Sequence, residues 1–106
     1  MKATVSAVFG FPDESVEQAE QVVQKALGLA LEKHDSMYLG IYSIAEDALG
    51  KFRLCENYNR FDEAWTEEEY KIYPTLLYAT VAADKLACVS QALNLHAPQI
   101  KLLKQN

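Results

Sequence analysis

The sequence predicts an all-α fold, in which three to four helices form a single-domain bundle. Apolar residues recur at intervals of three and four over long stretches of the chain, as they do on one face of a helix. Only a few residues connect the first two stretches, which is typical of antiparallel neighbouring helices. The 106 residues, of which 50% are hydrophobic and 24% charged, suffice for one core. The alternative is an α+β fold with a central hairpin at residues 37–58.

The first helix is expected over residues 13–35, after an N-terminal arm of residues 1–12. Its first turns are acidic, an arrangement that the helix dipole favours, and Pro12 and Asp13 mark its start. Gly28 would lie inside this helix, where glycine costs about 1 kcal/mol relative to alanine. The apolar positions that define its buried face are Val16, Ala19, Val22, Val23, Ala26, Leu27, Ala30 and Leu31.

The second helix is expected over residues 36–58, with Ser36 as its N-cap. Polar residues recur there at steps of three and one, and adjacent apolar pairs such as Ala48-Leu49 contradict a strict alternation. The first two helices would then form an antiparallel pair. The competing interpretation is a β-hairpin that turns at Leu49-Gly50, because a strand buried on both faces permits adjacent apolar residues.

The third helix is expected over residues 66–95, with a kink near residue 74. Thr66 and Glu69 have the spacing of a capping box, and Pro74 removes one helical hydrogen bond about two turns later. Between residues 76 and 95 the polar positions form only a narrow stripe. Such a helix is central or lies in a subunit interface, which predicts a homo-oligomer. A short terminal helix is expected at residues 98–104.

Charge and motifs exclude several classes of function. Fifteen acidic residues against ten lysines and arginines give a net charge of −5, which argues against nucleic acid or a membrane as partner and favours a basic protein. Cys55 and Cys88 lack metal-ligand spacing and are expected to be reduced, buried thiols. The first residues make a poor signal peptide, so a cytoplasmic location is expected. The sequence indicates no catalytic residues, cofactor or metal site, because it lacks a glycine-rich loop and a histidine spaced for nucleophilic catalysis.

One segment combines acidic with aromatic side chains, between Glu56 and Tyr73. Tryptophan, tyrosine and arginine dominate the energetics of interfaces, and carboxylates around them steer a basic partner. The sequence therefore predicts a protein-binding module, namely a small acidic inhibitor, immunity protein or regulator. In the competing interpretation the aromatic rings only pack this segment onto the bundle. The predicted partner-binding residues are Arg60, Phe61, Asp62, Glu63, Trp65, Glu67, Glu68 and Tyr70.

The alternative function is a small oligomeric helical enzyme with a carboxylate or metal site between subunits. The first and second predicted helices each offer one pair of neighbouring carboxylates to such a site, and oxygen ligands of this kind hold Mg²⁺. The candidate residues of this site are Glu17, Glu20, His34, Glu46 and Asp47. A third interpretation is a constitutive subunit whose apolar helix docks into a larger assembly.

Overall fold

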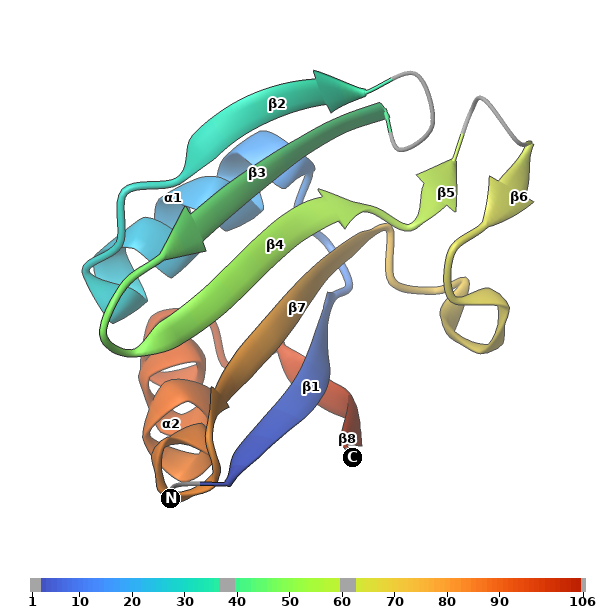
Figure 1. Ribbon diagram of the computed structural model, residues 1–106. Helices are drawn as coiled ribbons and strands as arrows, with labels where there is room; N and C mark the ends of the chain where they lie inside the picture. The colour runs from blue at the N-terminus through green and yellow to red at the C-terminus, as the bar shows by residue number, and fades with distance from the viewer. Residues whose placement is uncertain (1–2, 37–39, 60–62, 106) are drawn as a thin grey trace.

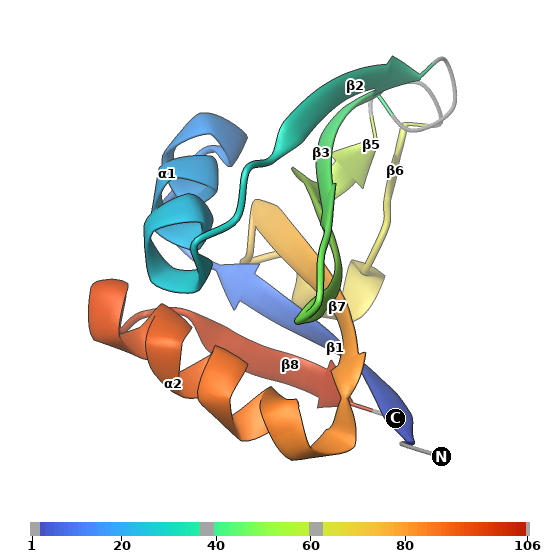
Figure 2. The same ribbon diagram turned by 60° about the vertical axis from the view of Figure 1, so that its left-hand side comes forward.

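The computed structural model describes residues 3–36, 40–59 and 63–105, and these form an α+β fold instead of the predicted helical bundle. A six-stranded sheet carries both α-helices on one face (Figures 1 and 2). The helices are α1 (Val16–Leu27) and α2 (Leu86–His96). In sheet order, the strands are β2 (Glu32–Ser36), β3 (Gly40–Glu46), β4 (Gly50–Glu56), β7 (Thr75–Ala82), β1 (Thr4–Phe11) and β8 (Lys101–Gln105).

The connections place the first strand inside the sheet. Helix α1 leads from β1 to the far edge strand β2, and β2, β3, β4 and β7 then follow as antiparallel neighbours. Helix α2 leads from β7 past β1 to the other edge strand, β8. Residues 1–12, expected to be an arm, and residues 98–104, expected to be a helix, thus contain the adjacent strands β1 and β8.

The first predicted helix exists, but it is shorter than expected. The Ser15 side chain accepts a hydrogen bond from the Gln18 backbone N–H, and Gln18 reaches back to the N–H of Ser15, which forms a capping box. Helix α1 ends at Gly28, whose φ of 66° is left-handed and favours glycine. Gly28 is therefore the C-cap and not an interior residue. Residues 32–36 of the predicted helix belong to strand β2.

The predicted second helix over residues 36–58 is wrong. Strands β3 and β4 form an antiparallel hairpin there, which turns between Asp47 and Gly50 through mutual backbone hydrogen bonds of 3.0 and 3.2 Å. This is the hairpin of the alternative interpretation; its residues 37–39 lie outside the described residues. The alternation was present in the sequence, because Phe52 and Leu54 are buried whereas Lys51 and Arg53 lie on the opposite face.

The predicted third helix over residues 66–95 is also wrong, because it merges several elements. A short 3-10 helix, η1 (Glu68–Tyr70), precedes β7, and a second one, η2 (Ala83–Lys85), joins β7 to α2. The predicted capping box does not form, since η1 begins after Glu67 without a side-chain cap. Strand β7 is apolar because both of its faces are covered in its first half, and such a strand lacks alternation.

The core lies mainly between the sheet and the two helices. Alternate residues of β1, β4 and β7 meet the buried face of α1 and α2 there, and the helices contact one another. A smaller cluster occupies the opposite face of the sheet, where Tyr73 covers Val8 and Leu76. The side chains of the main cluster that are less than 2% exposed include Phe9, Phe11, Val23, Leu54, Leu77, Val81, Val89 and Leu93.

Candidate functional site: a groove on the open face of the sheet

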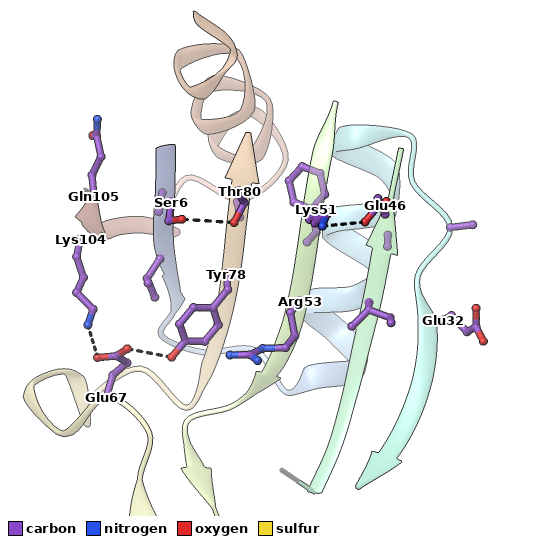
Figure 3. A pocket seen from close by; sticks show the side chains of 17 residues that line it. Ser6, Glu32, Glu46, Lys51, Arg53, Glu67, Tyr78, Thr80, Lys104 and Gln105 are labelled. Atoms are coloured by element: carbon purple, nitrogen blue, oxygen red, sulfur yellow. Dashed lines mark hydrogen bonds and ion pairs between the residues drawn. The ribbon is translucent and has the colours of Figure 1, made fainter. Parts of the chain in front are cut away.

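A groove of about 900 Å³ lies on the sheet face that the helices leave open (Figure 3). Its floor is made by residues of β1, β3, β4 and β7, with β2 at one side and β8 at the other. One end is closed by residues 63–74, here named the covering segment, which places Glu67 in the wall of the groove. Binding sites for small organic molecules have volumes of this order.

Strand register builds the groove from side chains in transverse rows. The central row crosses all six strands through directly paired residues, Glu32, Ile44, Arg53, Tyr78, Val8 and Lys104. A second row contains Glu46, Lys51, Thr80 and Ser6, of which the two hydroxyl groups lie 3.4 Å apart. Neighbouring strands in a sheet are about 4.8 Å apart, so side chains that are paired across adjacent strands lie within reach of a single small ligand.

Glu67 is bound on both of its carboxylate oxygens. The Tyr78 hydroxyl donates to Oε1 over 2.9 Å, and the Lys104 ammonium lies 2.7 Å from Oε2. Burial and this hydrogen bond raise the pKa of Tyr78, so its hydroxyl stays protonated and keeps donating. The hydrogen bond to Glu67 also raises the pKa of Lys104. The three groups join the covering segment to β7 and β8.

Arg53 lies at the middle of the groove without a carboxylate partner in the described part of the chain. Its guanidinium carbon is 4.7 Å from the centre of the Tyr78 ring, which is the geometry of a cation–π contact. The ion pairs in the groove join other residues, because Glu46 contacts Lys51 at 3.5 Å and Glu67 contacts Lys104. Arg53 was not among the residues expected from the sequence, although the alternation from Lys51 to Leu54 would place it on a polar sheet face.

The buried side chain of Asn57 also holds the covering segment. Its amide nitrogen donates to the carbonyl oxygens of Glu67, Tyr70 and Tyr73 at 3.3, 2.8 and 3.0 Å. Its Oδ1 accepts from the Glu67 backbone N–H at 2.8 Å. Tyr73 in turn packs directly over Gly10, where an added Cβ would lie 2.6 Å from the ring. The segment is thus fixed against the sheet by polar and apolar contacts.

The predicted partner-binding residues separate into two groups. Glu67 and Tyr70 turn toward the sheet, since Tyr70 donates its hydroxyl hydrogen to the Leu103 carbonyl at 3.1 Å. Trp65 is half-buried, and Glu63 and Glu68 are exposed, with Glu68 lying 3.7 Å from Lys71. The remaining three predicted residues, Arg60, Phe61 and Asp62, lie outside the described residues.

Trp65 and the nearby Glu63 belong to a small hairpin at the end of the sheet, whereas Glu68 begins η1. Strands β5 (Tyr58–Asn59) and β6 (Ala64–Trp65) pair with each other and extend beyond the end of β4 (Figure 1). Tyr58 and Trp65 face each other edge to face, with ring centres 5.2 Å apart. Glu63 beside them adopts a left-handed φ of 53°, and Glu69 on η1 is also exposed. The hairpin therefore presents an aromatic pair among carboxylates.

The carboxylates of the alternative metal site do not form a group in the described part of the chain. In the residues described, no three metal-ligating side chains lie close enough together to hold an ion. Glu20 accepts a hydrogen bond from Ser43, whereas Glu46 pairs with Lys51 and Asp47 accepts from the Leu49 backbone N–H in the hairpin turn. His34 stacks on Tyr42 and lies 3.6 Å from Glu32. Glu17 is exposed on α1.

Both cysteines are free, but only one is buried. Cys55 is buried in β4, and burial raises its pKa to about 11, so the thiol is inert at neutral pH. Cys88 is exposed on α2, which corrects the prediction that both thiols are buried. Within the described residues, neither helix has the length and apolarity that crossing a membrane requires.

The comparisons with known proteins leave the function to be argued from this geometry. The chain matches no known protein family, and no curated protein resembles it in sequence.

Proposed function

We propose that this protein is a protein-binding module that acts as a small acidic inhibitor, immunity protein or regulator of a basic partner. The observation that carries the proposal is the β5–β6 hairpin, which presents Tyr58 and Trp65 at the surface next to exposed carboxylates. Exposed aromatic anchors surrounded by charge are typical of the centres of interfaces.

Two further features support a binding role for the hairpin. Asn57 anchors the chain directly after Trp65, because its backbone carbonyl accepts from the Thr66 N–H and its side chain binds the backbone of Glu67. This anchoring lowers the entropy that the hairpin would lose on association. The exposed glutamates 63, 68 and 69 add negative charge to one end of a chain that is already acidic. Such a surface accelerates the encounter with a basic protein at low ionic strength.

The experiment is affinity capture with matched variants of the tagged protein. Trp65→Ala combined with Glu68→Lys changes the proposed surface, whereas Glu17→Lys makes the same change of charge on α1. We expect the wild type and Glu17→Lys to retain one basic partner at low salt, and the double variant to lose it. Washing at about 0.5 M salt should also release the partner, because the Debye length falls to a few ångströms.

Thermal melts of all three proteins separate binding from stability. A partner retained equally by the double variant would contradict the proposal. Loss of the cooperative melt in that variant would show that Trp65 is structural.

The homo-oligomer was expected from an apolar third helix, which the described residues 63–105 do not contain. The apolar stretch from Leu77 to Leu93 is divided between the central strand β7 and the buried face of α2, so it no longer supports a subunit interface. Light scattering on the purified chain measures its oligomeric state directly.

A further inference from the structure

We infer that the groove on the open face binds a small organic molecule through an oxyanion, a carboxylate or a phosphate, that Arg53 holds. This site differs from the hairpin surface in position and in the charge that it recognises. The site is formed by the central row of the sheet. The inference does not depend on whether the hairpin binds a protein.

The first support is the electrostatic state of Arg53. Its side chain is only partly exposed, and the described residues place no carboxylate within ion-pair distance of it. Glu67, on the far side of Tyr78, already shares its two oxygens with Tyr78 and Lys104. Glu32 belongs to the same row but lies two strands away, a backbone separation of about 10 Å. A partly desolvated guanidinium of this kind gains more from an anion than an exposed one does.

The second support is preorganisation. The cation–π contact with the Tyr78 ring restrains the guanidinium, and Figure 3 shows the Arg53 side chain extended across the floor of the groove toward that ring. A planar guanidinium offers two parallel N–H donors to a carboxylate or a phosphate. Tyr78 is itself held by a hydrogen bond to Glu67, so the paired N–H donors of Arg53 are positioned before a ligand binds.

The third support is an apolar surface beside the charge. Ile44 faces Arg53 across the β3–β4 pair and is 37% exposed, although isoleucine is a residue that proteins usually bury. An anion bound at Arg53 can lay an aliphatic or aromatic body on Ile44. The combination fits an amphiphilic anion better than an inorganic ion.

The experiment titrates the purified chain with two series of probes by calorimetry. Butyrate, hexanoate and octanoate test the carboxylate, and inorganic phosphate and phenyl phosphate test the phosphate. We expect saturable binding in one series, tighter for the probe with the larger apolar body. The series that binds identifies the head group, and binding in either one supports an oxyanion site.

Variants assign the binding to Arg53. Arg53→Lys keeps the charge but loses the fork and should weaken binding by about tenfold or more, and Arg53→Gln should abolish it. Lys85→Gln removes a positive charge from exposed η2, outside the groove, and should leave the affinity unchanged. Equal affinity of the wild type and Arg53→Gln would overturn the inference, as would no saturable binding of any probe at tens of millimolar.

A measurement on the wild type covers the case in which an Arg53 variant fails to fold. In NMR spectra, the best-binding probe should shift the Arg53 side-chain N–H and the Tyr78 ring resonances first. Shifts confined to other parts of the chain would overturn the site. Trp65→Ala should bind the same probes as the wild type, so failure of the hairpin proposal and failure of the groove proposal are distinguished.

Discussion

The two faces of the sheet use the same strands for different purposes. On β1, Phe9 points into the main core under the helices, whereas its neighbour Val8 points to the opposite face and belongs to the central row of the groove. The helix face is closed and apolar. In the described residues, Tyr73 and the rest of the covering segment cover one end of the open face, which carries charged residues elsewhere. Alternation along one strand thus separates stability from binding, so each can change with little effect on the other.

The largest expected effect tests this difference between the faces directly. Phe9→Ala should lower the free energy of unfolding by about 3–5 kcal/mol, because it leaves a cavity in the main core. Val8→Ala, one residue away on the opposite face, should cost only about 2 kcal/mol, because the valine side chain buries less apolar surface on folding. Urea denaturation of both variants measures the two values. Equal costs would show that the open face contributes as much packing as the helix face.

The second prediction concerns the polar attachment of the covering segment. Asn57→Ala leaves buried carbonyl oxygens of that segment without donors and should cost about 3 kcal/mol. Hydrogen exchange should accelerate first at the amides of residues 67–73, while the amides of α1 stay protected. Asn94→Ala is the matched control, because it removes a single side-chain hydrogen bond to a backbone carbonyl. Uniform acceleration across the chain would contradict a separately attached segment.

The third prediction uses the titratable groups of the open face. The folded state raises the pKa of Cys55 from 9.0 to about 11, so the native state holds its proton more tightly than the unfolded chain. This contribution to stability is complete below pH 9 and is lost as the pH rises from about 9 to about 11, with a total on the order of 2 kcal/mol. Tyr78, whose pKa is also raised, acts in the same direction.

Denaturation at several alkaline pH values measures that slope. Cys55→Ala should flatten the loss of stability above pH 9, and Cys88→Ala, which changes an exposed thiol, should leave it unchanged. An identical slope in both variants would show that the burial of Cys55 does not control the titration of its thiol.

The smallest effect concerns a position that packs on neither face. Gly28→Ala should cost about 1 kcal/mol, because the left-handed φ of 66° disfavours a side chain although the space around Gly28 is open. Gly28→Asn should cost less, since asparagine tolerates this conformation. Thermal melts compare the two variants. An increase in stability for Gly28→Ala would agree with a helix that continues to residue 35 and would contradict the observed end of α1.

The sequence allowed the first helix to be predicted because α1 is buried on one face only. Val16, Ala19 and Val23 keep a clear helical spacing there. The same reasoning failed for strand β7, because Leu76 and Leu77 are both buried, one on each face of the sheet. The apolar residues after β7 belong to α2. The narrow polar stripe of the predicted third helix, which includes Thr80, Asp84 and Gln91, therefore combined residues of β7, η2 and α2.

The candidate site was partly predictable for a related reason. Composition drew attention to Trp65 and Glu63, which the structure leaves half-buried and exposed, and their role in binding stays a prediction. Composition did not distinguish Glu67 and Tyr70, whose inward contacts depend on Tyr78 and Leu103. Arg53 was missed because its position depends on the register of β4 against β7, and register is decided by contacts that are distant in sequence.

The position of β1 inside the sheet also determines the order in which the protein can fold. The β2–β3–β4 hairpins close short loops, whereas Phe11 of β1 must find Thr75 and Ala7 must find Gln105. Closing such long loops costs more entropy, so β1 pairs late. Until β1 pairs, its Phe9 and Phe11 are exposed and both of its edges lack hydrogen-bonding partners. We therefore expect partly folded chains to aggregate through β1.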